Sequence, residues 1–329
     1  MPPEIALDAA PHRAWSSRLV QLGLVWLLLF VVTFEEWAQM AHQWWNIDTY
    51  SHILLIPAII AWLVWIKRDE LAALSPEDWW PALAWFGAGL LVWLGGRTLD
   101  INLFAQAGAV MAFQGAAIAL FGLRTSLILA LPIAYSCFLV PFGDEIIPQL
   151  QAITAHLATW LTQASGVAMV SDGIYIDTPA GLFIVAEACS GVKFLIAMVT
   201  LGTLVAFTCF ESWTRRAWLM LACVVVPIIA NGIRAWATIF IAQYVGAEAA
   251  GSFDHIVYGW FFFGIVIALV LGVARRWFER DPEDAGWSLA EIEEMPTLAA
   301  LERKTMSATF IVAIMLAVAI AFAAVAHLG

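Results

Sequence analysis

Long apolar runs, separated by short polar segments, dominate the pattern of this chain. A helix needs about 20 consecutive apolar residues to cross the hydrocarbon core of a membrane. Nine runs reach or approach that length, at residues 19–34, 51–66, 81–96, 103–121, 125–142, 188–210, 217–243, 257–274 and 307–327. The pattern therefore predicts an all-α polytopic membrane protein with about eight to nine transmembrane helices.

The segment 143–187 departs from this pattern. Apolar residues recur at helical spacing in its first part, at Ile146, Leu150, Ile153, Leu157, Trp160 and Leu161. This spacing predicts an amphipathic helix, which either lies on the membrane surface or packs in a cap outside it. The second part contains two short strand-like runs, 174–177 and 182–186, separated by the turn-forming sequence Thr-Pro-Ala-Gly. It predicts a β-hairpin that leads directly into Cys189.

Composition and charge agree with a membrane location. Hydrophobic residues make up 63% of the chain and charged residues 12%, whereas soluble domains carry roughly 25% charged residues. The net charge of −11 reflects scarce Lys and Arg, and we expect no nucleic-acid partner. Placing the N-terminus in the cytoplasm puts twelve of the 15 basic residues inside, as the positive-inside rule requires. We therefore expect a multi-pass membrane protein with its N-terminus in the cytoplasm.

The same reasoning divides the chain into three parts. Residues 1–278 form the membrane core, 279–306 a charged cytoplasmic linker and 307–329 a C-terminal transmembrane helix. The basic residues that this topology leaves outside are Arg97, Lys193 and Arg234. Ionisable residues in such positions either form interfacial ion pairs or serve function.

Cys189 is the cysteine with the surroundings of a nucleophile. Cys137, Cys209 and Cys223 lie inside apolar runs and are expected to act as small hydrophobic side chains. No CxxC or Cys/His cluster is present, so we expect no metal site. Cys189 instead follows the predicted hairpin at the start of a helix, where a thiolate is favoured. The alternative is a buried structural cysteine.

Residues near Cys189 in sequence, or at the same predicted membrane face, complete the candidate site. Ser190 and Gly191 allow close approach of the backbone, so their amides are candidate oxyanion donors. Asn231 and Arg234 share one helix face, and Arg234 would stabilise an oxyanion or bind a carboxylate.

His255 is the candidate general base. The sequence leaves open whether Tyr258, Asn231 or Glu187 orients this histidine. An ion pair with Glu187 is the structural alternative for Arg234.

Five segments resemble the motifs of the exosortase/archaeosortase family. They are DTYSHILLIPAIIAWLVWIKR, LPIAYSCFLVPFGDEIIPQLQAITA, IVAEACSGVKFLIA, IIANGIRAWA and FDHIVYGWFFF. Together they run in order from about residue 45 to residue 278, and they are most similar to the bacterial exosortase A branch.

The resemblance implies a membrane-embedded cysteine transpeptidase or protease. Such an enzyme cleaves C-terminal sorting signals of the PEP-CTERM type at the periplasmic face, through a thioester. The resemblance implies Cys189 as nucleophile with Arg234 and His255, no cofactor, and a link to exopolysaccharide genes. Two other functions remain open: an acyltransferase that uses Cys189, and a non-enzymatic component of polysaccharide export.

Overall fold

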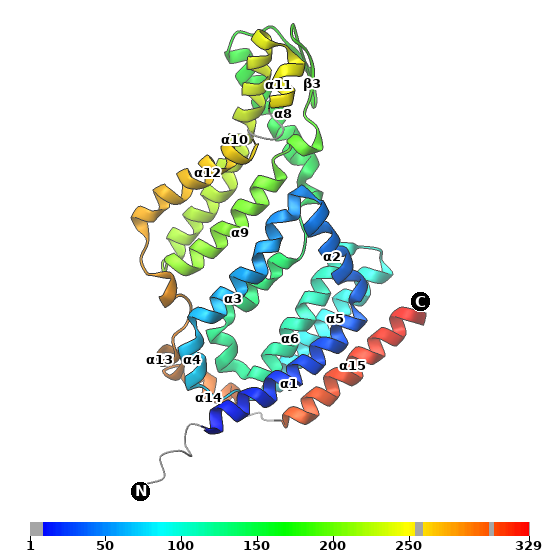
Figure 1. Cartoon of the computed structure of the whole chain (residues 1–329), viewed down its shortest axis with the longest axis vertical. Coiled ribbons are helices and arrows are strands. Elements are labelled where there is room, and N and C mark those ends of the chain that lie inside the picture. Colours follow the sequence, from blue (N-terminus) through cyan, green and yellow to red (C-terminus); the bar gives the residue numbers. More distant parts are fainter. Residues whose placement is uncertain (1–8, 254–258, 303–305, 329) are drawn as a thin grey trace. The chain divides into compact units, whose positions relative to one another are not determined.

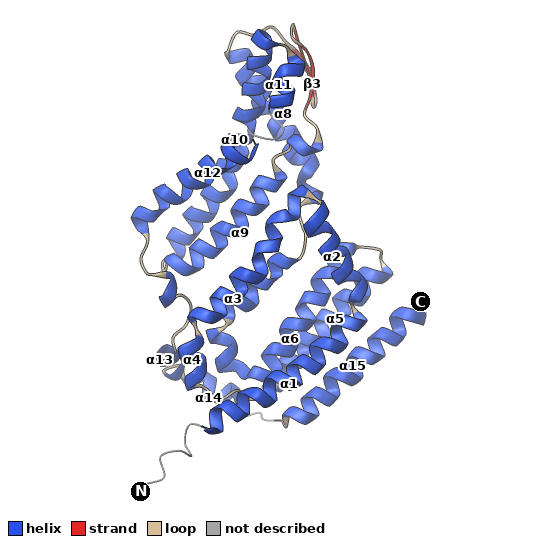
Figure 2. Cartoon of the chain, in the orientation of Figure 1, coloured by secondary structure: helices blue, strands red, loops and turns tan. Residues whose placement is uncertain are grey.

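The computed structural model describes residues 9–253, 259–302 and 306–328, and helices dominate it (Figure 2). The chain divides into two compact units. The first comprises residues 1–141 and 283–329, and the second residues 142–282. The boundaries of the three parts predicted from sequence remain a prediction.

Helices α5 and α6 form the centre of the first unit, with α1 and α15 packed beside them (Figure 1). Gly108 of α6 lies so close to α5 that an added Cβ would be 2.2 Å from the backbone nitrogen of Trp93. The elements of this unit are α1 (Ala9–Val32), α2 (Phe34–Asn46), η1 (Asp48–Leu55), α3 (Ile56–Ile66), α4 (Arg68–Ala73), η2 (Trp80–Ala82), α5 (Leu83–Thr98), α6 (Asn102–Ile128), α7 (Ala130–Tyr135), η3 (Ser136–Leu139), α13 (Leu289–Glu293), α14 (Pro296–Glu302) and α15 (Ala308–Leu328).

Helices α9, α10 and α12 lie side by side in the second unit (Figure 1). Its elements are η4 (Asp144–Ile146), α8 (Ile147–Ala164), β1 (Val170–Asp172), β2 (Tyr175–Thr178), β3 (Gly181–Ile184), η5 (Glu187–Cys189), α9 (Val192–Cys209), α10 (Trp213–Val245), α11 (Ala247–Phe253), α12 (Gly259–Ala274) and η7 (Arg275–Trp277). A further short turn, η8 (Pro282–Asp284), follows at the boundary of the units. Phe194 of α9 stacks on Phe263 of α12 with ring centroids 4.6 Å apart. Apolar side chains thus hold the three helices together.

Six of the described helices are long and apolar enough to cross a membrane: Ala14–Val32, Asp48–Ile66, Asn102–Ile128, Val192–Cys209, Trp213–Val245 and Ala308–Ala326. Two pairs of shorter helices raise the number to eight if each pair is one span. These pairs are Ala130–Leu139 with Asp144–Ala164, and Phe261–Trp277 with Pro282–Glu293. The predicted all-α polytopic membrane fold is confirmed. The predicted run 81–96 corresponds to α5, whose 16 residues fall short of a full span.

The hairpin predicted from sequence is present. Thr178 of β2 pairs with Gly181 of β3, which leaves a tight turn at Pro179 and Ala180. Strand β1, which the sequence pattern did not predict, adds a third antiparallel strand beside β2. All three of its residues are exposed, so no alternation of buried residues marks it.

The predicted helix is present as α8, and only part of its apolar set is buried within the protein. The larger apolar side chains Ile153 and Trp160 are exposed, Trp160 by 62%. The buried positions are Leu150, which belongs to the predicted apolar set, and Thr154, Ala155, Ala158 and Thr162. Mostly small side chains at these positions let α8 pack closely on α10, where an added Cβ on Gly232 would lie 2.7 Å from the Cβ of Leu157.

Candidate active site

Cys189 ends the short turn η5, between strand β3 and helix α9. Its backbone N–H donates to the carbonyl of Ala186 at 2.8 Å, and the N–H of Ser190 donates to the carbonyl of Glu187 at 3.0 Å. Cys189 itself is half-buried and packs against the apolar cluster between α8, the sheet and α10. The thiol is therefore neither deep in a core nor on an open surface, which suits a nucleophile.

Gly191 forms the junction between this turn and α9. It has a left-handed conformation with φ of 82°, which glycine adopts without steric cost. Its carbonyl accepts the N–H groups of Phe194 and Leu195, both at 3.1 Å. The hydroxyl of Ser190 accepts the N–H of Val192 at 3.3 Å. The Ser190 side chain thus helps to cap the start of α9.

Two buried polar side chains hold the peptide carbonyls of this turn. The amide nitrogen of Asn231 donates to the carbonyl oxygen of Cys189 at 2.8 Å and to the hydroxyl of Thr154 at 3.0 Å. The Thr154 hydroxyl donates in turn to the carbonyl of Ser190 at 3.4 Å. Helices α8 and α10 are therefore both linked to the backbone that bears the thiol.

Gln151 adds a third contact from α8. Its side-chain amide donates to the carbonyl of Val185 at 3.0 Å, just after strand β3. Gln151 and Thr154 are three residues apart and so share one face of the helix. Sequence reasoning did not assign them a role. The available signal was that both are polar residues at i, i+3 spacing, away from the larger apolar residues of this amphipathic helix.

Arg234 lies one turn beyond Asn231 on α10 and is only 7% exposed. Its guanidinium lies over the ring of Phe194, 5.7 Å from the ring centroid. Within the described residues, its Nε atom has no hydrogen-bond partner and no ion pair joins it to a carboxylate. The Oδ1 atom of Asn231 is likewise buried without a partner there. Among the described residues, the site therefore contains a buried donor and a buried acceptor that form no hydrogen bond.

Of the other residues proposed from sequence, the structure describes Glu187 and Lys193 but not His255 or Tyr258. Glu187 is exposed at the start of η5, and the described residues include no ion pair between it and Arg234. His255, the candidate base, lies outside the described residues, as does Tyr258. Lys193 lies over the ring of Phe194 at 5.2 Å from Nζ to the centroid.

The other cysteines and the outlying arginine have structural surroundings. Cys209 and Cys223 are buried, as expected, whereas Cys137 is exposed and its sulfur accepts a hydrogen bond from Gln114 at 3.4 Å. Arg97 pairs with Glu35 at 2.7 Å and with Glu36 at 3.2 Å. These ion pairs explain the outer position of Arg97, and we assign Arg97 no role at the candidate active site.

Comparisons with known proteins agree with the resemblance noted in the sequence. The family model described as transmembrane exosortase matches residues 44–272, a range that contains Cys189, Asn231, Arg234 and the Thr154 contact. No curated protein and no solved structure matches the chain. The match covers well over half of the chain and includes the whole candidate site, and we conclude that this chain belongs to the transmembrane exosortase family.

Proposed function

We propose that this chain is a membrane cysteine transpeptidase that cleaves C-terminal sorting signals, with Cys189 as its nucleophile. Family membership supports a transpeptidase-type role in protein sorting. The observation that carries the assignment to Cys189 is the 2.8 Å hydrogen bond from Asn231 to the Cys189 carbonyl. It joins the thiol-bearing turn to the face of α10 that also bears the buried Arg234, whose Nε atom has no partner among the described residues.

The chemistry follows from these positions. The thiol gives its proton to His255, and the thiolate attacks the carbonyl carbon of the scissile peptide bond. The tetrahedral intermediate carries a negative oxygen, which needs donors already in place. Collapse of the intermediate breaks the C–N bond, His255 returns the proton to the leaving amine, and a thioester on Cys189 remains. An amine acceptor or water then releases the acyl group.

The oxyanion donors can be narrowed from the backbone contacts. The N–H groups of Cys189 and Ser190 already donate within η5, so neither is free for substrate. The N–H of Gly191 makes no hydrogen bond with any residue that the structure describes. We assign the oxyanion contacts to this N–H and to the Nε–H of Arg234. Asn231 and Thr154 are then positioning residues, because they contact the backbone of the turn.

The substrate is proposed to be a PEP-CTERM-type signal, which has a short motif, a membrane helix and a basic tail. A membrane helix in the substrate suits an enzyme that is itself embedded in the bilayer. We place the protein in the bacterial inner membrane, with its N-terminus in the cytoplasm and Cys189 facing the periplasm. This orientation puts most Lys and Arg residues inside.

The decisive experiment follows a tagged protein with such a signal in cells that express the full chain. The Cys189→Ala variant should insert in the membrane at normal levels and leave the substrate uncleaved. Cys137→Ala is the matched control, because it removes another accessible thiol and should leave processing intact. Normal processing by Cys189→Ala would refute the assignment. Mass spectrometry of the trapped thioester distinguishes a peptide from a fatty acyl group, and so a transpeptidase from an acyltransferase.

A further inference from the structure

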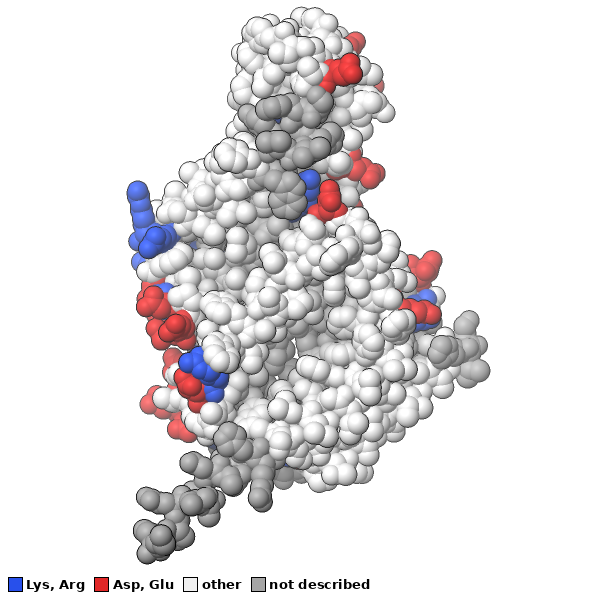
Figure 3. All heavy atoms as spheres, in the orientation of Figure 1, with Lys and Arg blue, Asp and Glu red and all other residues white. Residues whose placement is uncertain are grey.

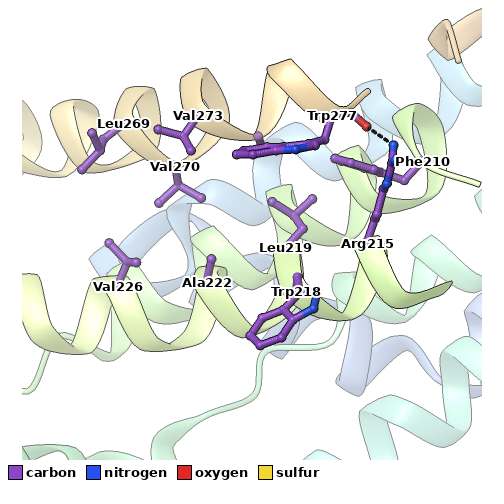
Figure 4. Close-up of a pocket in the computed structure, with 11 residues that line it drawn as sticks. Phe210, Arg215, Trp218, Leu219, Ala222, Val226, Leu269, Val270, Val273 and Trp277 are labelled. Carbon is purple, nitrogen blue, oxygen red and sulfur yellow. Dashed lines mark hydrogen bonds between the residues drawn. The ribbon is translucent and has the colours of Figure 1, made fainter. Parts of the chain in front are cut away.

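An apolar groove lies between helices α10 and α12, at the end of α10 remote from Asn231 and Arg234. Its volume is about 740 Å³, within the range of roughly 300–1,000 Å³ typical of small-molecule sites. Figure 4 shows Leu219, Ala222 and Val226 of α10 facing Val270 and other residues of α12. The remaining lining residues are Phe210, Arg215, Trp218, Leu269, Val273, Ala274 and Trp277.

The groove has a closed floor and an open side. Leu219 and Val270 are buried against α9, whereas Trp218 is 67% exposed and Leu269 is also exposed. From Arg215 to Val226 the groove follows α10 for about 16 Å, at 1.5 Å per residue. Helix α10 is a candidate membrane span and α12 is part of a bent pair that can count as one, so we expect this open side to face hydrocarbon. A long, flexible apolar chain suits the groove better than a compact polar ligand.

Positive charge gathers at one end of the groove. The segments 210–218 and 274–282 together contain five arginines against three carboxylates. Figure 3 shows basic side chains gathered at the end of α12. Arg275 and Arg276 are exposed there, and within the described residues neither forms an ion pair.

The side chains of the other three arginines already form hydrogen bonds or an ion pair within the protein. Arg216 donates to the carbonyl of Phe210 at 2.7 Å and 3.0 Å, and Arg280 donates to the carbonyl of Phe207. Both stabilise the end of α9. Arg215 pairs with Glu279 at 3.0 Å and donates to the carbonyl of Trp277 at 3.2 Å, yet its side chain is 46% exposed. Arg215 lines the groove itself, and the exposed Arg275 and Arg276 lie in sequence between its lining residues Ala274 and Trp277.

We propose that this groove binds one acidic phospholipid. An acyl chain lies between α10 and α12, and the phosphate contacts Arg275, Arg276 and Arg215. The combination of an apolar channel with a cationic mouth matches a molecule that has a hydrocarbon tail and an anionic head. The basic tail of the proposed substrate carries the wrong charge for this mouth. The site does not depend on the chemistry at Cys189.

Native mass spectrometry of the full chain tests this proposal. The protein is exchanged into micelles that contain equal amounts of phosphatidylglycerol and phosphatidylcholine. We expect one retained phosphatidylglycerol. The Arg275→Gln/Arg276→Gln variant should reduce its affinity roughly 10- to 30-fold, since each basic residue near an anionic headgroup contributes about a fivefold factor. Arg68→Gln is the matched control, because Arg68 is an exposed arginine elsewhere that pairs with Asp69.

Filling the groove should remove the lipid by a second route. Ala222→Phe places a ring between the two helices, and Val273→Trp fills the opening from an exposed position that tolerates bulk. Either variant, if it elutes as the wild type does on gel filtration, should lose the bound lipid. Ala61→Phe, in a second apolar groove, should retain it.

Three results would overturn the proposal. One is equal retention of phosphatidylcholine and phosphatidylglycerol by the wild-type chain. Another is full retention of phosphatidylglycerol by correctly folded Val273→Trp. The third is capture of a sorting-signal peptide, in place of lipid, by a photocrosslinking residue introduced at Leu269. The Cys189→Ala variant should lose activity and still retain the lipid, so the test of lipid binding and the test of catalysis are independent.

Discussion

Gly191 and Asn231 are in direct contact, so close that a Cβ on Gly191 would lie 2.7 Å from the Cγ of Asn231. The glycine also has a φ of 82°. Two separate constraints thus require glycine at the position that follows Cys189-Ser190. The amide of Asn231 reaches the Cys189 carbonyl because no side chain lies between α9 and α10 at this point.

Replacing Gly191 should therefore disable the enzyme. Gly191→Ala incurs the cost of the left-handed conformation, roughly 1–2 kcal/mol, and also displaces Asn231. We expect sorting-signal cleavage to fall below detection. Gly166→Ala is the matched control, since Gly166 has a φ of 76° with no atom within 4 Å of its added Cβ. It should lose a similar amount of thermal stability and keep its activity. Equal activity of the two variants would contradict the contact argument.

The hydrogen bond between Thr154 and Asn231 should affect turnover. Thr154→Val keeps the shape and removes the hydroxyl, which leaves one N–H of a buried amide without an acceptor at a cost of about 1–3 kcal/mol. We expect kcat to fall about tenfold with little change in KM, and Thr154→Ser to restore it. Purified enzyme and a fluorogenic signal peptide provide the measurement.

A second threonine on the same helix provides the control for that prediction. Thr162 is fully buried in α8, and its hydroxyl has no hydrogen-bond partner in the described structure. Thr162→Val should leave kcat unchanged and keep or raise the melting temperature. If both Thr154→Val and Thr162→Val lost kcat to the same extent, valine itself would be disturbing α8. The proposed role of the Thr154 hydroxyl in turnover would then be refuted.

Arg234 should not tolerate lysine. Its guanidinium is buried over the ring of Phe194, and a lysine ammonium lacks both the planar shape and the Nε–H donor. We expect Arg234→Lys to lose at least about 100-fold in kcat/KM, the usual scale for one oxyanion donor. Arg97→Lys should keep full activity, because its partners Glu35 and Glu36 accept any cation. Full activity of Arg234→Lys would refute the oxyanion assignment.

Glu279 should make stability depend on pH. The N–H groups of Ser212 and Glu211 donate to its carboxylate, and together with Arg215 they lower its pKa below the usual value. Stabilisation by a carboxyl with a lowered pKa is complete above its usual pKa and is lost as pH falls through the lowered one. We expect Glu279→Gln to melt at a lower temperature than wild type at pH 7, and the difference to vanish in strong acid.

An exposed carboxyl outside this contact provides the comparison for the melting experiment. Glu248 lies on the surface of α11. Glu248→Gln should melt at the wild-type temperature from neutral to acidic pH. If the melting temperatures of wild type and Glu279→Gln differed by the same amount at every pH, the charge of Glu279 would not be the cause of the stabilisation.

Hydropathy was enough to predict the membrane class, because repeated runs of about 20 apolar residues are typical of helices that cross a bilayer. The hairpin before Cys189 followed from its turn chemistry, in which Gly181 permits the tight reversal. Both features depend on residues close together in sequence. The prediction of Cys189, Asn231 and Arg234 as one site relied on topology and motif resemblance. The structure places Asn231 on the Cys189 carbonyl.

The contacts of Thr154 and Gln151 could not be predicted in the same way. Thr154 and Asn231 are 77 positions apart, and their meeting depends on how closely α8 packs on α10. That distance is set by small residues, such as Ala158 and Gly232, which carry little weight in a hydrophobicity pattern. The pattern favours the larger Ile153 and Trp160, which are exposed in the structure, and gives no sign of the small residues on which the contact with α10 depends.

Pro227 separates the part of α10 that lines the groove from the part that bears Asn231 and Arg234. It lies inside the helix, directly after Val226 of the groove and four residues before Asn231. Proline has no N–H to donate, so the carbonyl of Cys223 lacks its usual intrahelical bond. Kinks in long helices occur mostly at such prolines. We therefore expect α10 to flex more readily at Pro227 than elsewhere, so that a displacement at the groove is partly taken up there before it reaches the hydrogen bond between Asn231 and the Cys189 carbonyl.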